Sequence, residues 1–278
     1  MTEYQLKGTA AALVELFAGK IHQHGMYDSE GAAFYHSFTV RDNAEVEELL
    51  SAAEGRPGPV LELCCGSGRL TLPFLQNGFE VVGLDNSPSM LEILAERMRE
   101  PEHQEYAGRL STVEGDMTDF SLDRKFDLIV LGATAVWNLT QEQRAELFRC
   151  VREHLAEDGR FLLTVLDIAG FESAAAAFEY TSVFPTKDDR SPVLCTFIDR
   201  IEPDGLRSTS ILANRVQSGE VVDTALYTAW THLAPLGALE KELAAEGLKL
   251  AGQRELVNRH QITRSSSARR RLLLEVTL

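Results

Sequence analysis

The sequence has little cysteine and no long apolar run. Only four of its 278 residues are cysteines, with no Cys-x-x-Cys pair and no histidine at metal-ligand spacing beside them. We therefore predict free thiols, and neither a disulfide framework nor a metal site. No apolar stretch reaches the length of a membrane span, and Glu3 near the start argues against a signal peptide. A cytoplasmic location without membrane attachment is expected.

Positive charge is also scarce. The chain has 27 lysines and arginines against 42 aspartates and glutamates, which gives a formal net charge of −15. Binding to a phosphate backbone needs clustered positive charge that displaces counterions, so no nucleic-acid partner is expected. The run Arg269-Arg270-Arg271 is the exception, and we interpret it as a solvated turn before a final strand. The acidic balance favours a neutral or cationic partner.

The middle of the chain has the pattern of an α/β protein. From residue 60, short apolar runs alternate with amphipathic stretches, which is typical of a parallel sheet wrapped by helices. The predicted strands are residues 60–63, 80–84, 111–115, 127–132 and 159–166. The helices between them are expected to begin near Arg69, Pro88 and Gln141, with Ser87 as an N-cap.

Different patterns flank this α/β part. Helices are predicted within residues 1–25 and at about 42–53, on either side of an aromatic stretch, before the breaker EGRPGP. After residue 168 the pattern predicts antiparallel strands at 193–201, 206–216 and 220–232, then a helix at about 235–246 and a hairpin from roughly 249–257 and 270–278. We divide the chain into an N-terminal helical lid (1–58), a Rossmann-like core (59–168), a β-rich insertion (169–234) and a segment that completes a seven-stranded core (235–278).

Acidic residues mark the ends of the first three predicted strands. The first strand contains Glu62 and runs into the turn Cys64-Cys65-Gly66-Ser67-Gly68, where glycines let the backbone approach a ligand. Asp85 closes the second strand 17 residues beyond Gly68, where a carboxylate can accept hydrogen bonds from both hydroxyls of a ribose. Asp116 follows the third strand and can accept from an adenine amino group, with Met117 packed on the ring. Each acid taken singly could instead cap a helix or a turn.

Four segments, VLELCCGSG, VVGLDNSPSML, EGDM and FDLIVLGATAVWNL, resemble the successive motifs of class I S-adenosylmethionine-dependent methyltransferases. The resemblance covers roughly residues 25–168 and, more loosely, the terminal helix and hairpin. It implies that S-adenosyl-L-methionine is the cofactor and S-adenosyl-L-homocysteine the product. The implied cofactor-binding residues are Tyr27, Tyr35, Glu62, Cys64, Gly66, Asp85, Asn86, Met90, Asp116, Met117 and Gly132.

The glycine turn departs from the family pattern at one position. Cys64 stands where the family most often has glycine, and we expect it to be tolerated if its φ is negative. A dinucleotide dehydrogenase is the competing interpretation of a glycine turn followed by an acid. Its third glycine position, counted from Gly66, is Thr71. The missing glycine and the EGDM segment favour the methyltransferase.

The methyl acceptor is less well marked. The resemblance extends to bacterial N-methyltransferases of natural-product biosynthesis that act on amino sugars or on the N-terminal amine of ribosomal peptides such as daptides. It implies catalytic candidates in Tyr35 of the aromatic lid and in Asn138, which aligns with a histidine in some such enzymes. His232 is a further candidate base. O- or C-methylation, and a regulatory module without turnover, remain open.

The β-rich insertion lies where related enzymes build an acceptor-binding cap or a dimer surface, so a homodimer is one of the open uses of this segment. Its candidate lining residues are Tyr180, Asp199, Arg200 and Trp230.

Overall fold

The computed structural model describes residues 4–17, 19–40, 42–56, 58–184, 192–256 and 269–278. Its contacts group the chain into two compact units. One, the sheet unit, joins Met1–Phe38 to Gly170–Leu233, and the other, the core unit, joins Thr39–Ala169 to Ala234–Leu278. The predicted lid segment 1–58 is thus divided between the two units. No helix in the described ranges is long and apolar enough to cross a membrane.

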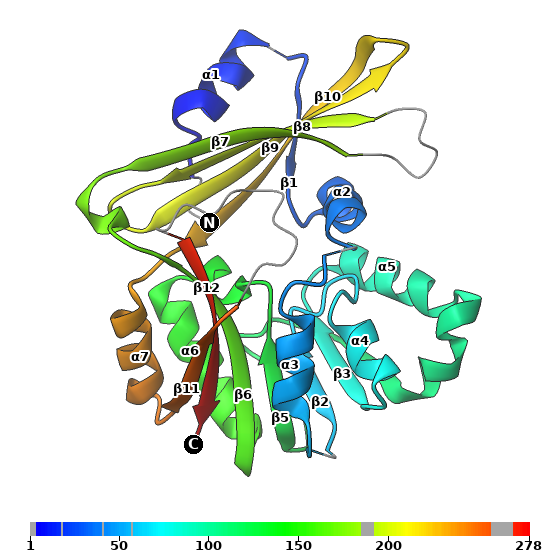
Figure 1. Ribbon diagram of the computed structural model, residues 1–278, viewed down its shortest axis with the longest axis vertical. Helices are drawn as coiled ribbons and strands as arrows, with labels where there is room; N and C mark the ends of the chain where they lie inside the picture. The colour runs from blue at the N-terminus through cyan, green and yellow to red at the C-terminus, as the bar shows by residue number, and fades with distance from the viewer. Residues whose placement is uncertain (1–3, 18, 41, 57, 185–191, 257–268) are drawn as a thin grey trace. The chain divides into compact units, whose positions relative to one another are not determined.

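The core unit contains the predicted seven-stranded α/β sheet (Figure 1). Its strand order is β11-β12-β6-β5-β2-β3-β4. The strands are β2 (Val60–Leu63), β3 (Val81–Asp85), β4 (Leu110–Glu114), β5 (Phe126–Leu131), β6 (Leu155–Ile168), β11 (Lys249–Glu255) and β12 (Arg269–Thr277). Five adjacent strands are parallel to one another, in the order β4, β3, β2, β5 and β6. Strand β12 is antiparallel to both β6 and β11. The five strands predicted between residues 60 and 166 are all present.

The chain order reverses direction across the sheet at β2. From β2 the chain adds β3 and β4 on one side, and it then returns to add β5 and β6 on the other side. Ligands of open α/β sheets bind outside the carboxyl ends of the strands at such a switch point. The turns after β2 and β5 therefore flank the expected ligand position.

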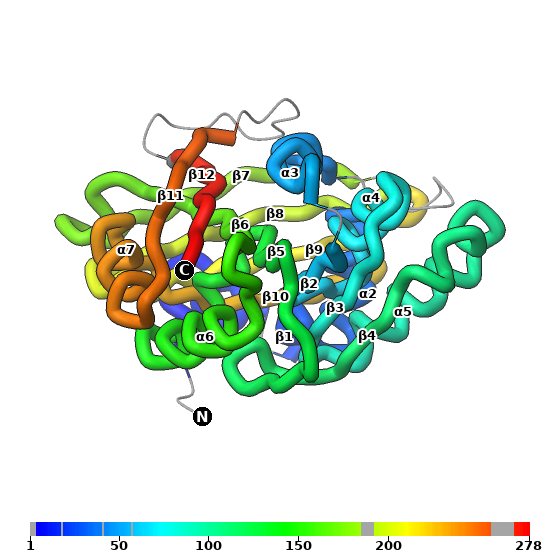
Figure 2. Tube along the Cα trace, turned by 90° about the horizontal axis from the view of Figure 1, so that it is seen from below, coloured from blue at the N-terminus to red at the C-terminus, as the bar shows by residue number. Residues whose placement is uncertain are grey.

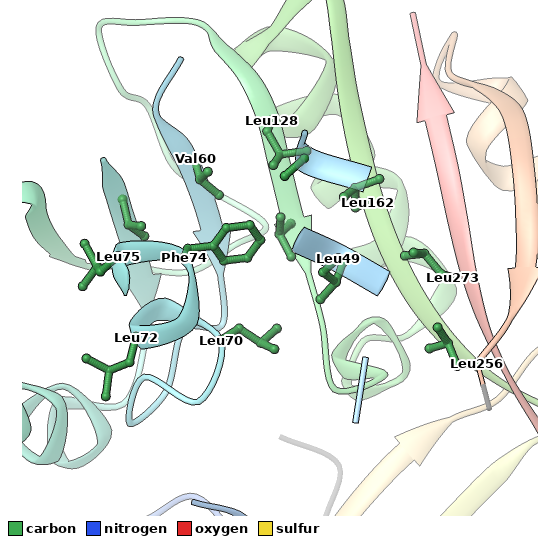
Figure 3. Packing of buried hydrophobic residues seen from close by; sticks show 13 residues of the cluster. Leu49, Val60, Leu70, Leu72, Phe74, Leu75, Leu128, Leu162, Leu256 and Leu273 are labelled. Carbon is green, nitrogen blue, oxygen red and sulfur yellow. The ribbon is translucent and has the colours of Figure 1, made fainter. Parts of the chain in front are cut away.

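Helices cover both faces of this sheet, and apolar side chains fill the space beneath them. In Figure 2, α3 (Val46–Ala53) and α4 (Thr71–Gln76) lie on one face and α6 (Gln141–His154) on the other. Figure 3 shows Leu49 of α3 and Phe74 of α4 packed over Val60, Leu128 and Leu162 of the strands. Burial of such side chains is worth about 1.5 to 3 kcal/mol each and holds these helices against the strands whose ends form the site.

Local sequence signals set several helix ends. Ser87 caps α5 (Pro88–Met98) as predicted, because its Oγ accepts a hydrogen bond from the Met90 amide at 3.3 Å. Thr140 and Gln143 form a reciprocal capping box at the start of α6. The final helix, α7 (Leu236–Ala245), is followed by Gly247 with φ 80°, as expected of a C-terminal glycine.

The arginine run was wrongly interpreted as a turn. The backbones of Arg269 to Arg271 already form the start of β12, and Arg270 pairs with Asp167 of β6 at 2.5 Å. Cross-strand pairing with an acid explains why charged residues extend the strand here.

The sheet unit is built around a five-stranded sheet with the order β1-β10-β9-β8-β7. The strands are β1 (His22–Gly25), β7 (Ala176–Phe184), β8 (Val193–Ile201), β9 (Leu206–Gln217) and β10 (Glu220–His232). The three predicted strands match β8, β9 and β10. Strand β1 was missed because it is a polar edge strand, held by backbone pairing to β10 and marked by no apolar alternation.

Two helices of this unit pack on opposite faces of its sheet. Phe34 of α2 (Ser29–Thr39) stacks on Tyr227 of β10, with ring centroids 4.0 Å apart. On the other face, Gly8 of α1 (Gly8–Leu16) lies near Arg200 of β8. Phe34 and Phe38 both join the apolar cluster on the α2 face.

Candidate functional site

Several residues with a strained backbone conformation lie at the carboxyl edge of the core sheet. Cys64 after β2 (φ 53°), and Ala133 and Thr134 after β5 (φ 54° and 58°), take the left-handed conformation that favours glycine. Glu45, which directly precedes α3, has φ 68°. Such residues cost energy and persist only where their surroundings hold them, and they concentrate at functional sites. Four of them beside the switch point mark this edge as the candidate site.

Asp85 ends β3 at this edge and is only 8% exposed. Its carboxylate accepts hydrogen bonds from the backbone amides of Gly66 at 2.7 Å and Ser87 at 2.9 Å. Burial raises the pKa of the Asp85 carboxyl above its ordinary value of 3.8, and the amides of Ser87, Gly66 and Asn86 oppose that rise. The geometry ties the end of β3 to the glycine turn after β2, which the sequence predicted to share one site.

Glu62 lies within β2, two residues before Cys64. It is 2% exposed, and one carboxylate oxygen accepts a hydrogen bond from the Thr71 hydroxyl of α4 at 2.6 Å. Burial raises the pKa of Glu62 from 4.5 to about 8, although Thr71 and the positive charge of Arg69 oppose the rise. Burial therefore favours the protonated form of Glu62.

This raised pKa makes folding stability depend on pH. Between pH 4.5 and about 8 the folded protein holds a proton on Glu62 that the unfolded chain has released. Stability from this group is therefore greatest below pH 4.5 and falls as the pH rises towards 8, by at most about 1.4 kcal/mol per pH unit. Glu62→Gln removes the titration. We expect the difference in unfolding free energy, wild type minus variant, to decrease across this window in urea titrations, and a constant difference would contradict the assignment.

Cys64 does not have the negative φ that we expected. Its φ is 53°, so the side chain replaces the family's usual glycine in the left-handed region itself. Its Sγ lies 3.4 Å from Sδ of Met117, which follows β4, so the structure brings these two predicted cofactor residues together. Burial raises the pKa of the Cys64 thiol far above its ordinary value, which makes it a poor nucleophile or metal ligand.

Two glycines at the edge have no room for a side chain. A Cβ at Gly68 would lie 2.5 Å from Cδ1 of Leu94, and Gly68 has φ 83°. A Cβ at Gly132 would lie 2.3 Å from Cδ1 of Leu70 and 3.2 Å from Oε1 of Glu45. Gly66, by contrast, has open space in front of Asp85, because a Cβ there would be 4.0 Å from the nearest carboxylate oxygen. The turn leaves bare backbone where a ligand has to approach.

Three more predicted cofactor residues follow β3 or β4 in the core unit. Met90 of α5 is buried, and its Sδ would be 4.0 Å from a Cβ at Gly66. Asn86 and Asp116 are exposed. The Asp116 carboxylate accepts from the amide and hydroxyl of Thr118 at 2.9 and 2.8 Å, which is also the bonding of a simple turn.

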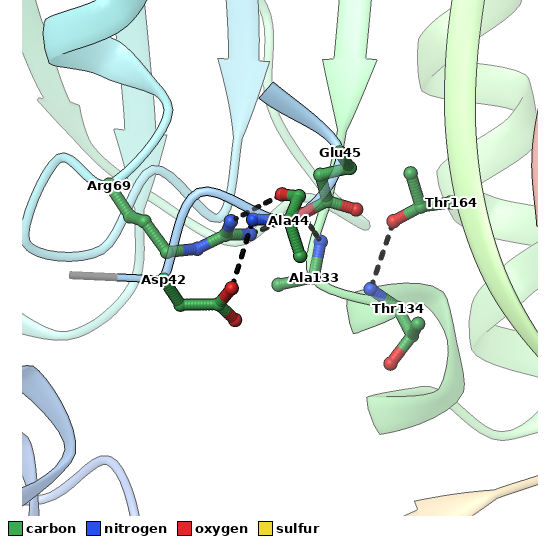
Figure 4. A network of polar contacts seen from close by, with 7 residues as sticks. All are labelled: Asp42, Ala44, Glu45, Arg69, Ala133, Thr134 and Thr164. Carbon is green, nitrogen blue, oxygen red and sulfur yellow. Dashed lines mark hydrogen bonds and ion pairs between the residues drawn. The ribbon is translucent and has the colours of Figure 1, made fainter. Parts of the chain in front are cut away.

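A buried ion pair at the switch point was missed by the sequence analysis. Glu45 and Arg69 form a short contact, and Glu45 also accepts a hydrogen bond from the Ala133 amide at 2.8 Å (Figure 4). The available signal was Arg69 itself, because an arginine directly after a buried glycine turn needs an acidic partner. Nothing in the local sequence indicated which acid that would be.

Asn138 lies in the turn that follows β5. It ends the short 3₁₀ helix η2 (Ala135–Asn138), which is anchored by the buried Trp137 through a hydrogen bond from its ring nitrogen to the Leu166 carbonyl at 3.1 Å. Arg144 lies over the Trp137 ring, 5.4 Å from its centroid. Asn138 therefore lies in a well-packed turn at the same edge as Gly132.

The other predicted catalytic residues belong to the sheet unit and lie on opposite faces of its sheet. Tyr35 is on α2, where its ring contacts that of Tyr27 at 5.2 Å. The register of β10 places His232 on the same face as Trp230, opposite α2, and its Nε2 lies 3.1 Å from the Tyr4 hydroxyl. Tyr35 and His232 therefore do not meet across this sheet.

The candidate lining residues of the insertion divide in the same way. Tyr180 and Asp199 lie on the face that α2 covers, and Arg200 and Trp230 lie on the other face. Asp199 is buried and paired to Arg207 at 2.9 Å. Trp230 packs against the Tyr4 ring at 5.2 Å.

The groups at the core unit's carboxyl edge fit a cationic nucleoside cofactor. Three acids, Glu62, Asp85 and Glu45, are buried there around a turn of bare backbone. Within the described ranges, one buried oxygen of Glu45 has no hydrogen-bond partner. Among the described residues, a group spaced for a metal is formed by Glu100, Glu102 and His103. That group lies in η1 (Pro101–Arg109), which leads into the amino end of β4, away from this edge.

Comparisons with known proteins agree with this geometry. Residues 60–159 match the family model described as a methyltransferase domain. The chain is similar to the cypemycin N-terminal methyltransferase of Streptomyces sp, with 25% identity over 196 residues, which are 69% of this chain and 73% of that protein. An uncharacterized methyltransferase of Staphylococcus carnosus (strain TM300) is 30% identical over 129 residues, 46% of this chain and 56% of that protein. The solved glycopeptide N-methyltransferase MtfA, complexed with S-adenosyl-L-methionine, matches with a TM-score of 0.58 and 26% identity over 85% of this chain and 93% of its own.

Proposed function

We propose that this chain, an S-adenosylmethionine-dependent methyltransferase of class I, transfers the methyl group to an amine nitrogen of a small molecule or a peptide. When bound, S-adenosyl-L-methionine supplies a methyl group that its sulfonium already activates. The protein then has to align the acceptor with the methyl group and exclude water, and alignment of this kind supplies roughly 7 to 11 kcal/mol.

The observation that carries the proposal is the position of the histidines in the core unit. In the described part of this unit, both lie in segments that lead into the amino ends of strands. His103 is in η1 before β4, and His154 ends α6 directly before β6, where its Nε2 is 2.9 Å from the Leu122 amide. Asn138 at the carboxyl edge can orient an acceptor but cannot take its proton. We therefore infer an acceptor that needs no histidine base at this edge, such as an amine that is neutral when it attacks.

Charge and relatives support the same acceptor. The net charge of −15 favours the approach of a cationic amine, which loses its proton as it is desolvated. The cypemycin enzyme is named an N-terminal methyltransferase, and MtfA is named a glycopeptide N-methyltransferase. A peptide α-amine and a small-molecule amine are therefore the two acceptor classes that we propose.

Residue roles follow from the edge geometry as proposals. Asp85 would hold the ribose hydroxyls and Asp116 the adenine amino group. The turn from Glu62 to Gly68, together with Gly132, would lie along the methionyl end. Asn138 would orient the acceptor. Tyr27 and Tyr35, which belong to the sheet unit, stay candidates on the resemblance alone. His232 stays a weaker candidate, because its sheet face is opposite that of Tyr35.

The test is an acceptor panel with matched blocked controls. The purified chain is incubated with S-adenosyl-L-methionine and a peptide with a free α-amine, the same peptide N-acetylated, an amino sugar, or a phenol. We expect S-adenosyl-L-homocysteine and a methylated nitrogen, by mass spectrometry, with one of the free amines and none with the acetylated peptide. Turnover of the phenol alone would replace the proposal with O-methylation. Binding of the cofactor without any turnover would favour a regulatory module.

A further inference from the structure

A single buried carboxylate joins the two turns that flank the switch point. The Glu45 side chain has 0% exposure, and its Oε1 accepts hydrogen bonds both from the Ala133 amide at 2.8 Å and from the Arg69 guanidinium (Figure 4). Ala133 belongs to the turn after β5, and Arg69 directly follows the glycine turn after β2. Glu45 is thus the bridge between the two loops expected to enclose the methionyl end of the cofactor.

Glu45 and the turn after β5 that it contacts have unfavourable backbone conformations, which depend on hydrogen bonds from their surroundings. Glu45, Ala133 and Thr134 all have positive φ, which is unfavourable for a residue with a side chain. The Thr134 amide is held from the other side by the buried Thr164 hydroxyl of β6 at 3.1 Å. Arg69 is held a second time by the Ala44 carbonyl at 3.1 Å. The shape of the turn after β5 therefore depends on Glu45 on one side and on Thr164 on the other.

The second oxygen of the same carboxylate is unsatisfied. Oε2 of Glu45 is buried and has no hydrogen-bond partner among the residues that the structure describes. A buried acceptor without a donor is costly, and native proteins rarely keep one without a reason. An unsatisfied carboxylate oxygen of Glu45, whose other oxygen contacts the Ala133 amide of the turn after β5, suits a site that is completed when a hydrogen-bond donor binds beside it.

We propose that Glu45 is a positioning residue for the amino-acid end of the cofactor. It holds the turn after β2, through Arg69, and the turn after β5, through Ala133, at the separation that receives the methionyl group. It also contributes negative charge opposite the methionyl ammonium. This inference rests on the cofactor placement proposed above, and it is independent of which acceptor is methylated.

The test compares two ligands that differ in this end alone. S-adenosyl-L-homocysteine carries the amino-acid end, and 5′-methylthioadenosine lacks it. Binding of both is measured by calorimetry for the wild type, Glu45→Gln, Glu45→Ala and the control Glu47→Gln, which changes an exposed acid of α3. We expect Glu45→Ala to weaken S-adenosyl-L-homocysteine binding about 10-fold or more and 5′-methylthioadenosine binding less than about 3-fold. Glu45→Gln, which keeps an acceptor for the Ala133 amide, should recover part of the loss, and Glu47→Gln should match the wild type.

The outcomes separate this role from a general structural one. Equal losses for both ligands, or no loss for either in a variant that unfolds at the wild-type temperature, would overturn the proposal. If Glu45→Ala does not fold, the ligand comparison is made on Glu45→Gln, whose shape is conserved, and the same selective loss is required. If Asp85→Ala binds S-adenosyl-L-homocysteine as tightly as the wild type does, the cofactor placement itself is contradicted. That failure is distinct from an unselective effect at Glu45.

Discussion

Asp85→Ala should weaken binding of S-adenosyl-L-homocysteine by about 2 to 5 kcal/mol, because a buried, charge-assisted acceptor is lost together with the fixed shape of the glycine turn. The carboxylate is 8% exposed and accepts the Gly66 amide at 2.7 Å, so its removal also leaves that amide without its partner. Calorimetry with the purified variant measures the loss.

The matched control is Glu92→Ala, an exposed acid on α5. It should leave the affinity unchanged. The affinity of Asp85→Asn for S-adenosyl-L-homocysteine should be close to that of Asp85→Ala. A side-chain amide has one oxygen, so it cannot replace both carboxylate oxygens that accept from the Gly66 and Ser87 amides. Unchanged affinity in a folded Asp85→Ala protein would remove Asp85 from the cofactor site.

Glu242→Ala should lower the free energy of unfolding by about 3 to 5 kcal/mol, because it leaves a buried arginine without its counter-charge. Glu242 of α7 pairs with Arg144 of α6 through two hydrogen bonds of 2.6 and 2.9 Å, and the Arg144 side chain is 3% exposed. Arg144 also donates to the Leu139 carbonyl at 2.9 Å. Loss of the pair should therefore loosen the turn that carries Asn138.

Urea denaturation measures this loss, with Glu240→Ala as the control. Glu240 is exposed on the same helix, so its removal should change stability by less than about 0.5 kcal/mol. A loss below about 1 kcal/mol for Glu242→Ala would mean that the pair contributes no more than a surface salt bridge does.

Much of the core sheet was predictable because its signals are local. Strands β2 and β5 are short apolar runs bounded by turns, and Ser87 with Pro88 marks a helix start in any context. The acid at the end of β3 could be placed because parallel strands bring their carboxyl ends to one edge. The same reasoning failed for β1, a polar strand whose existence depends on pairing to β10, about 200 residues later in the chain.

The sequence by itself determined the α/β core and the order of its parallel strands' motifs, because periodicity, caps and glycine turns act over a few residues. The resemblance of those motifs to class I methyltransferases implied the cofactor class. Only the tertiary structure decided that Cys64 adopts a positive φ, that Tyr35 and His232 lie on opposite faces of one sheet, and that Glu45 joins the turns after β2 and β5. Each of these depends on groups far apart in the chain. Burial at the switch point selects the partner of Arg69 from the many acids of this chain, and no local pattern encodes that choice.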